Sequence, residues 1–224
     1  MTDFRNQSGI LNVENYDYLT IGIVGCGAIG SWCATALNKL GFEKLVLIDD
    51  DIVEKHNVHS QVYKTSSIGS SKSYQLTSYL DGEQEYHNEK IKKGHFIDTD
   101  VVFICVDSLK ERKIIMKAIL DNYEKHQRPK LVIDGRMHGL IFRVLTVPIG
   151  ENKIVEQYTK GLQTKEFTGE CTQKGIIQNV FGVVSVMTEQ FKKVLNGEDY
   201  HAIINADLNT YSFMKQCLIK NKNE

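Results

Sequence analysis

Three glycines at the spacing Gly25-x-Gly27-x-x-Gly30 directly follow a short apolar run and open a helical pattern. This spacing permits a tight turn, close approach of the backbone to a phosphate, and close packing of a helix on a strand. The backbone from Gly25 to Gly30, including Ala28 and Ile29, is therefore predicted to bind a nucleotide phosphate. Asp49 lies at the distance expected of an acid that binds a ribose, so the loop taken alone favours an NAD-dependent oxidoreductase.

Further polar residues follow the loop at fixed intervals. They are Asp49-x-Asp51, Asn57, Gln61, Gly69-x-x-Lys72, Asp107-Ser-x-x-x-Arg112 and Cys171-x-x-x-Gly175. Several fixed spacings together are far more specific than one glycine loop. With them the chain resembles the ThiF/MoeB/HesA family and the adenylation domain of ubiquitin-activating enzymes, over about residues 1 to 197.

The resemblance implies an ATP-dependent adenylyltransferase that activates a carboxylate through an acyl adenylate and releases pyrophosphate. The expected substrate is the C-terminus of a ubiquitin-like or sulfur-carrier protein. Attack of a carboxylate on the α-phosphorus of ATP brings two anions together, so Mg²⁺, cations and backbone amides must neutralise charge. These residues provide such groups. The adenylyltransferase therefore replaces the oxidoreductase as the leading interpretation.

The resemblance also implies a role for each residue of the site. Asp49 would hold the ribose hydroxyls, Lys72 would contact phosphate and Asp107 would carry Mg²⁺. The remaining expected nucleotide contacts are Asp51, Asn57, Gln61 and Arg112. Taken singly, these residues have plainer explanations: a turn at Asp49, a solvated lysine at Lys72, and a helix N-cap at Asp107.

One position departs from the family pattern, because Ser60 stands where an arginine usually precedes the glutamine. Loss of such a cation can cost several kcal/mol of transition-state stabilisation, so an active enzyme should have a substitute. We expect Arg136, just beyond a predicted strand, to take over this role. Arg5 resembles an arm arginine that reaches the neighbouring subunit of a homodimer.

The five cysteines are odd in number and widely spread, which argues for reduced thiols. There is no CxxC pair, so no structural zinc is expected. Cys171 matches a position at which some sulfur-transfer relatives have a reactive cysteine, and it is a candidate nucleophile. Cys26, Cys33 and Cys105 are interpreted as core residues.

Composition describes a globular chain without a general affinity for polyanions. Twenty-seven Lys and Arg against 28 Asp and Glu give a net charge of −1, so nucleic acid is not an expected partner. No apolar run approaches the roughly 18 residues of a membrane helix, and the N-terminus lacks a signal pattern. A cytoplasmic location is expected.

Strand and helix patterns alternate along the first part of the chain. Strands are predicted over 19–24, 44–48, 85–91, 101–106 and 131–134, and helices over 28–40, 67–80 and 110–123. Such alternation predicts an α/β, Rossmann-like doubly wound sheet that is mostly parallel, with ligand at the carboxyl ends of its strands.

The regular alternation of strand and helix patterns ends after residue 135. A longer strand over 140–147, a functional or mobile loop over 150–170, a helix over 177–195 and a strand over 202–204 are predicted, which adds C-terminal antiparallel strands. We expect a single adenylation domain over 1–224. Its parts are an arm over 1–18, a nucleotide-binding half over 19–135, a substrate-binding half over 136–217, and a disordered tail over 218–224.

Three alternatives stay open at this point. The same chemistry could adenylate a small molecule, a peptide or a modified tRNA. The chain could also be a catalytically silent binding module, which Ser60 favours and the retained Asp49, Lys72 and Asp107 disfavour. The NAD-dependent oxidoreductase remains as a fourth interpretation, but it leaves Lys72 and Asp107 without a role.

Overall fold

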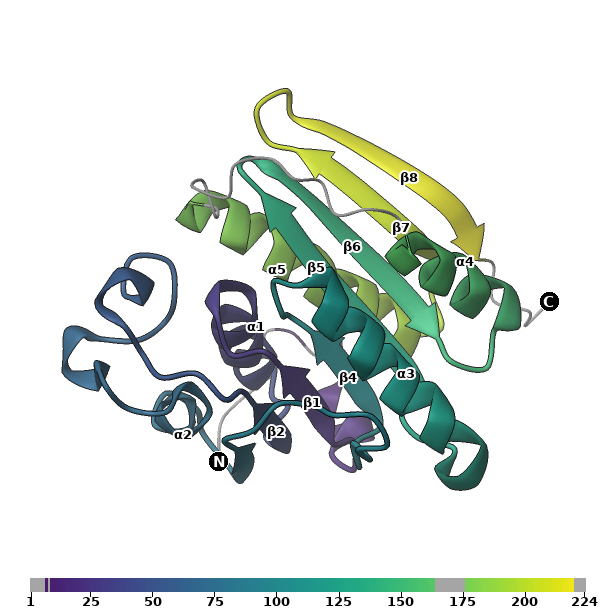
Figure 1. Ribbon diagram of the computed structural model, residues 1–224. Helices are drawn as coiled ribbons and strands as arrows, with labels where there is room; N and C mark the ends of the chain where they lie inside the picture. The colour runs from purple at the N-terminus through teal and green to yellow at the C-terminus, as the bar shows by residue number, and fades with distance from the viewer. Residues whose placement is uncertain (1–6, 8, 164–175, 220–224) are drawn as a thin grey trace.

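The computed structural model describes residue 7, residues 9–163 and residues 176–219. Within them, eight strands form one sheet in the order β3-β2-β1-β4-β5-β6-β7-β8 (Figure 1). The order β3-β2-β1-β4-β5 is that of a doubly wound nucleotide-binding sheet, in which the chain starts centrally and winds outward on both sides. The predicted fold class is confirmed.

The first half of the sheet is parallel. Its strands are β1 (Ile21–Val24), β2 (Leu45–Ile48), β3 (Gln84–His87), β4 (Val101–Ile104) and the start of β5 (Leu131–His138). Every residue of β1, β2 and β4 is buried, as expected for strands covered on both faces. Parallel pairing brings the carboxyl ends of these strands to one edge of the sheet.

The second half is antiparallel and consists of longer strands. β5 turns back through β6 (Ile141–Pro148), and the hairpin of β7 (Tyr200–Asp207) and β8 (Ser212–Ile219) completes the sheet. β5 therefore joins the two halves, since residues 131–134 pair in parallel with β4 while the whole strand pairs antiparallel with β6.

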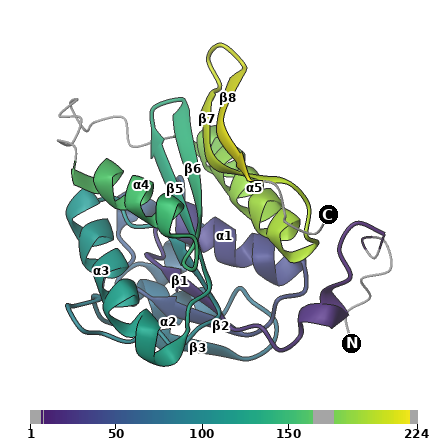
Figure 2. The ribbon, with the colours of Figure 1, turned by 90° about the vertical axis from the view of Figure 1, so that its right-hand side faces the viewer.

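Helices cover both faces of the sheet (Figure 2). On one face α1 (Ala28–Lys39) packs against α5 (Ile177–Leu195), and on the other α3 (Leu109–His126) packs against α4 (Asn152–Gln163). A short α2 (Lys72–Thr77) lies beside β2 and β3. Single 3₁₀ turns occur at Val13–Tyr16, Lys55–Asn57 and Thr65–Ser67. The two faces hold separate apolar clusters, each burying one side of the strands.

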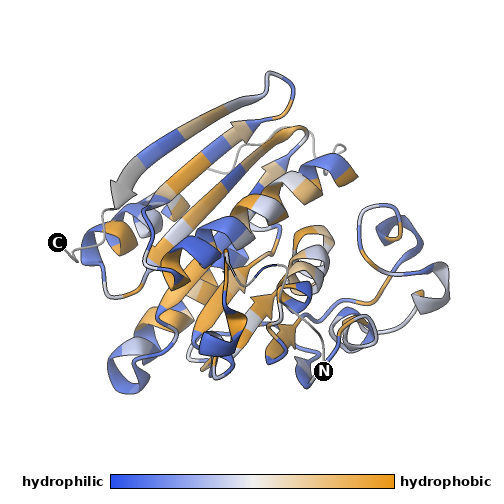
Figure 3. Cartoon of the chain, turned by 180° about the vertical axis from the view of Figure 1, so that it is seen from behind, coloured by the Kyte–Doolittle hydropathy of each residue, from blue (hydrophilic) through white to orange (hydrophobic). Residues whose placement is uncertain are grey.

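Spacing of apolar residues explains how the covering helices pack. α5 buries Val180, Val183, Val184, Met187 and Phe191, which recur every three or four residues and so share one face. Apolar colour concentrates on the inner strands of the sheet, while much of the helix ribbons is polar (Figure 3). None of the helices in the described part of the chain combines the length and the apolar character that a membrane span requires.

The predicted loop over 150–170 is wrong in its first part, where residues 152–163 form α4. Ile154, Val155, Tyr158 and Leu162 lie on one helical face and pack against the sheet. The solvent-facing residues dominate the composition of this segment and hide the apolar stripe.

Other boundaries also need correction. The predicted strand 202–204 is the middle of β7, and β8, which includes residues 218 and 219 of the predicted disordered tail, was missed. Residues 212–216 of β8 are all exposed, so this part of the strand shows no alternation of buried and exposed side chains. The predicted helix 67–80 shrinks to α2, because Gly69 has a φ of 91° and the chain bridges to Ile52 before the helix begins. The polar strand is β3, ending at His87 rather than residue 91.

Candidate nucleotide-binding site

The glycine loop leaves β1 and opens α1, as its spacing predicts. Gly25 has a φ of 91°, and a Cβ there would lie 2.9 Å from the backbone of Cys105 and Val106. A Cβ at Gly30 would collide with the carbonyl oxygen of Gly25. At Gly27, the N-cap of α1, a Cβ would meet nothing within 4 Å. Gly25 and Gly30 thus allow close packing, and Gly27 leaves space open at the start of a helix, where anions bind.

Asp49 follows β2 and is hydrogen-bonded to the glycine loop. Its Oδ2 accepts the backbone N–H of Cys26 at 2.6 Å, and its Oδ1 accepts that of Asp51 at 2.8 Å. Burial raises the pKa of the Asp49 carboxyl, while these two hydrogen bonds and the charge of Lys72 oppose the rise. The predicted ribose-binding acid and the predicted phosphate loop therefore form one unit.

Lys72 is the first residue of α2 and points to the same edge of the sheet. Its Nζ lies 2.8 Å from Oδ2 of Asp51, and its side chain is 8% exposed while that of Asp51 is 63% exposed. Its backbone N–H also donates to the carbonyl of Asp51 at 2.9 Å. The explanation of Lys72 as a solvated lysine is therefore wrong, since the ammonium group is buried beside the residues that follow β2.

Asn57 and Gln61 lie in the segment between β2 and α2. Asn57 is buried, and its Oδ1 accepts the backbone N–H of Glu54 at 2.8 Å, which closes a capping box. Oε1 of Gln61 is buried and has no hydrogen-bond partner within the described part of the chain. Trp32 of α1 donates its indole N–H to the carbonyl of Ser60 at 3.0 Å. This segment is docked on α1, with one acceptor left unsatisfied.

Asp107 is exposed and follows β4. The adjacent Ser108 is the N-cap of α3, where its hydroxyl accepts the N–H groups of Lys110 and Glu111 at 3.1 and 3.4 Å. The explanation of Asp107 as a helix N-cap is therefore wrong. Asp107 lies beyond the carboxyl end of β4, and its role as a metal ligand stays a prediction.

A fully buried carboxylate, Asp134, accepts hydrogen bonds from three side chains at the carboxyl end of the parallel part of β5. Arg136 donates from Nε and Nη2 to Oδ2 at 2.9 and 2.6 Å, and Tyr158 of α4 donates its hydroxyl to the same oxygen at 2.8 Å. Arg112 of α3 pairs with Oδ1. Two cations around one buried anion leave a local excess of positive charge, part of it on Arg136, whose side chain is 20% exposed.

Arg112 lies inside the fold rather than facing the open edge. Its side chain is 3% exposed, and it donates to the carbonyls of Gly135 at 3.0 Å, Ile104 at 3.4 Å and Val106. Burial, followed by the charge of Arg136, lowers the pKa of Arg112 to about 10. This placement differs from the predicted nucleotide contact, because these hydrogen bonds tie α3 to β5 and to the end of β4 with the residues that follow it.

Sequence reasoning missed three residues of this region, Tyr63, Asp134 and Tyr158. The helical spacing of Ile154, Tyr158 and Leu162 was an available signal for the last of them. No local pattern marked Tyr63, whose contacts are described below. Two predicted residues, Arg5 and Cys171, lie outside the described residues.

Potential metal ligands are limited in the part of the chain that the structure describes. The carboxylates of Asp49, Asp50 and Asp51 lie within 4.8 Å of one another, and they form the only group of three or more such ligands among these residues. Carboxylate oxygens suit Mg²⁺. Asp107 is not part of this group.

As the core interpretation predicted, Cys26, Cys33 and Cys105 are buried, free thiols. Burial raises the pKa of the Cys26 and Cys33 thiols well above the usual value. Because the thiolate is the nucleophile, neither residue is a candidate for covalent chemistry.

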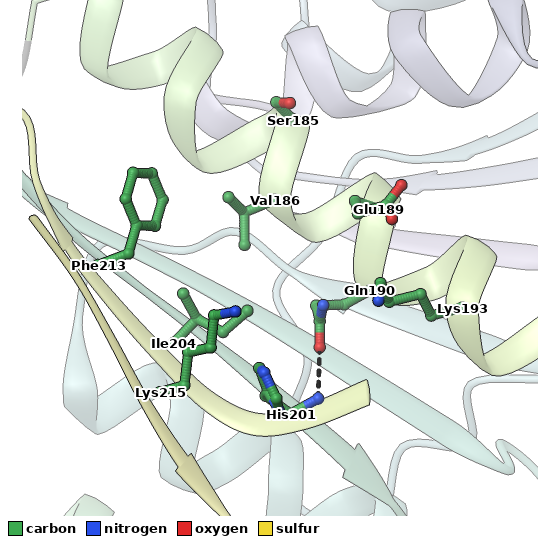
Figure 4. A pocket seen from close by; sticks show the side chains of 9 residues that line it. All are labelled: Ser185, Val186, Glu189, Gln190, Lys193, His201, Ile204, Phe213 and Lys215. Atoms are coloured by element: carbon green, nitrogen blue, oxygen red, sulfur yellow. Dashed lines mark hydrogen bonds between the residues drawn. The ribbon is translucent and has the colours of Figure 1, made fainter. Parts of the chain in front are cut away.

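A surface pocket of about 230 Å³ lies elsewhere, between α5 and the β7–β8 hairpin (Figure 4). Val186, Phe213 and Lys215 are among the residues that line it, and none of its lining residues belongs to the predicted nucleotide site.

Comparison with known families decides the classification. A sequence model of the ThiF family matches residues 8–224, which is nearly the whole chain. The chain belongs to the ThiF family. This membership argues against the oxidoreductase alternative and agrees with the resemblance predicted from the residues after the glycine loop.

Individual relatives match part of this ThiF chain. Ubiquitin-like modifier-activating enzyme 5 of Dictyostelium discoideum is 32% identical over 131 residues, which cover 49% of this chain and 34% of the relative. The Caenorhabditis elegans protein of the same name is 34% identical over 123 residues, covering 52% and 29%. The match thus spans about half of this chain and about a third of each relative.

Solved structures share the fold at low identity. Escherichia coli MccB with ATP has a TM-score of 0.70 at 14% identity, covering 94% of this chain and 67% of MccB. PaaA has a TM-score of 0.67 at 17% identity, covering 91% and 74%. At these identities the likeness shows the ThiF-type fold alone.

Proposed function

We propose that this ThiF-family chain is an ATP-dependent adenylyltransferase that activates a carboxylate. The hydrogen bond from the Cys26 N–H to Asp49 supports this proposal most directly. It joins the glycine loop, proposed to bind phosphate, to the acid proposed to bind ribose. Lys72, held through Asp51 beside that acid, adds a cation to the same edge of the sheet. Family membership supports the same chemistry.

In the proposed reaction a carboxylate oxygen of the substrate attacks the α-phosphorus of ATP. A carboxylate–phosphate anhydride bond forms, the bond from the α-phosphorus to the bridging oxygen of the β-phosphate breaks, and pyrophosphate leaves with that electron pair. The N–H groups at the start of α1 would donate hydrogen bonds to phosphate oxygens. Both carboxylate oxygens of Asp49 would accept hydrogen bonds from the ribose hydroxyls. Lys72 would stabilise the negative charge of the phosphates.

Mg²⁺ would neutralise phosphate charge and orient the leaving group. Carboxylate oxygens suit this hard cation, and they are present at Asp107 after β4 and, separately, in the 49–51 group after β2. We propose Asp107 as its protein ligand.

Arg136 is the proposed substitute for the arginine that Ser60 replaces. It sits beside a buried carboxylate with two cations, so part of its charge is available to a second anion. Its fixed fork suits a phosphate or the attacking carboxylate. Arg136→Ala should therefore lower turnover strongly while Arg112 and Tyr158 keep Asp134 satisfied, and unchanged ATP turnover in a folded variant would contradict the assignment.

The arm and the cysteine complete the proposal. Arg5 would act on the nucleotide of a second subunit in a homodimer, and Cys171 would be a candidate acceptor of the activated acyl group. Reduced, buried thiols fit a cytoplasmic setting.

We propose the C-terminal tail of a ubiquitin-like or sulfur-carrier protein as the substrate. Partial similarity to ubiquitin-like modifier-activating enzymes supports it. A peptide is the second candidate, favoured by the likeness to MccB, which has been solved with MccA.

Exchange of labelled pyrophosphate into ATP tests the function. Wild type should catalyse exchange only with Mg²⁺ and an acceptor carboxylate, and candidate carrier proteins and peptides should be compared. Asp107→Ala should abolish exchange. Asp121→Ala is the control and should not, because Asp121 is an exposed acid of α3 that pairs with Lys117. Exchange that survives loss of Asp107 would contradict the metal assignment. Nucleotide binding without exchange for any acceptor would favour the silent binding module.

A further inference from the structure

We propose that Tyr63 is a positioning residue that holds the glycine loop against the start of α2, so that the nucleotide site is formed before nucleotide arrives. This inference rests on the proposed function for its consequence, but its geometry is independent of it. The tyrosine belongs to no predicted motif, and it would not touch the reacting atoms.

Tyr63 reaches two segments with one hydroxyl. Its side chain is buried, and its oxygen lies 2.7 Å from the carbonyl oxygen of Cys26 and 3.2 Å from that of Lys72. Cys26 is in the glycine loop and Lys72 is the first residue of α2. A tyrosine has one proton to donate, so the two carbonyls share it, with the shorter contact to the loop.

The peptide groups flanking Cys26 are therefore held from both sides. Asp49 accepts the N–H of Cys26 at 2.6 Å, and Tyr63 donates to its carbonyl at 2.7 Å. Lys72 is held in a similar way, because its N–H donates to Asp51 while Tyr63 donates to its carbonyl. Together these hydrogen bonds join the loop, the acids after β2 and α2 into one frame.

The tyrosine itself is anchored to a third element. Its neighbour Val62 donates its N–H to Ser31 of α1 at 3.2 Å, and the Trp32 indole binds the carbonyl of Ser60. The ring of Tyr63 also packs edge-on against Tyr79, with centroids 6.3 Å apart. The hydroxyl thus has little freedom to leave the carbonyl of Cys26.

A loop that is ordered in advance binds its ligand with a smaller loss of entropy. Loss of the Tyr63 hydroxyl should therefore weaken nucleotide binding and leave the chemical step nearly unchanged. A purely structural tyrosine would lower stability without shifting affinity.

Two variants separate these cases. Tyr63→Phe removes the hydroxyl and keeps the ring. Tyr79→Phe is the matched control, since Tyr79 is partly buried and its hydroxyl contacts the Lys64 N–H at 3.0 Å and Ser67 Oγ at 3.2 Å, outside the loop.

Hydrogen exchange without nucleotide is the first measurement. We expect the amides of Cys26 and Lys72 to exchange about tenfold faster in Tyr63→Phe, the size of one lost buried hydrogen bond, and to be unchanged in Tyr79→Phe. Equal rates of amide hydrogen exchange at Cys26 in wild type and Tyr63→Phe would overturn the proposal, whatever the enzymatic activity of the variant.

Titration with Mg²⁺·ATP and pyrophosphate exchange are the second measurement. Tyr63→Phe should raise Kd and KM for ATP about five- to tenfold and change kcat less than twofold. A fall in kcat at constant KM would also overturn the positioning role. If wild type binds no ATP, the proposed function fails, and the exchange rates at Cys26 still decide whether Tyr63 holds the loop.

Discussion

The carboxylate of Asp49 lies 2.6 Å from the backbone nitrogen of Cys26 and accepts its hydrogen bond. Residues 23 positions apart in the chain are thus joined where β1 and β2 end side by side. The same acid that would hold ribose also holds the loop that would hold phosphate, so one substitution should disturb both halves of the nucleotide site.

Asp49→Asn should weaken binding of Mg²⁺·ATP by roughly tenfold to a hundredfold, the cost of losing a charged hydrogen-bond acceptor. The new amide would also point a donor at one of the two backbone N–H groups. Calorimetric titration measures the change. Asp121→Asn is the control, because Asp121 is an exposed acid of α3 that pairs with Lys117 at 3.1 Å. Equal losses in both variants would contradict the special role of Asp49.

The pH dependence of stability should reveal the raised pKa of Asp49. Folded wild type holds this proton more tightly than the unfolded chain, so the linked stability is present at low pH and is lost as pH rises through the folded pKa. Asp49→Asn has no such proton. The free energy of unfolding of the variant minus that of wild type should therefore increase as pH rises from about 4 towards neutrality. Urea denaturation over this range tests the sign, and a difference that decreases would mean a lowered pKa.

Lys72→Met should separate activity from stability. The thioether fills the buried space of the lysine stem, and Asp51, which is 63% exposed, can be solvated without its partner. We expect pyrophosphate exchange to fall about a hundredfold, with the free energy of unfolding changed by less than about 1 kcal/mol. Lys39→Met, which removes an exposed pair with Asp81, should leave both quantities near wild type. Full exchange activity in Lys72→Met would remove Lys72 from the site.

Arg112→Met should instead destabilise the fold. It removes one of the two cations on the fully buried Asp134, and the carbonyls of Ile104 and Gly135 lose the Arg112 donor. Removing one partner of a buried pair costs about 3 to 5 kcal/mol. Arg128→Met removes pairs with Asp98 and Asp100 that are partly open to solvent, and it should cost less, about 1 kcal/mol. Similar midpoints of urea denaturation for both variants would show that Arg112 is not structural.

Local sequence determined the parallel half of the sheet and the class of site. Short, wholly apolar runs such as Val101–Ile104 favour strands buried on both faces, and the glycines after β1 restrict the turn that follows. Because parallel strands end at one edge, the residues that follow them meet without further information. The predictions for the loop, for Asp49 and for the fold class all follow from such local rules.

Tertiary structure alone decided which partner each polar group found. Arg112 of α3 and Arg136 of β5 both pair with Asp134, yet the side chain of Arg112 is 3% exposed while that of Arg136 is 20% exposed. That difference depends on Asp134 and on its partner Tyr158. Tyr158 belongs to α4, a helix that was not predicted because polar residues dominate its sequence. Tyr63 is a similar case, because a buried hydroxyl is paired by atoms that lie close in space, and spacing along the chain does not encode those distances.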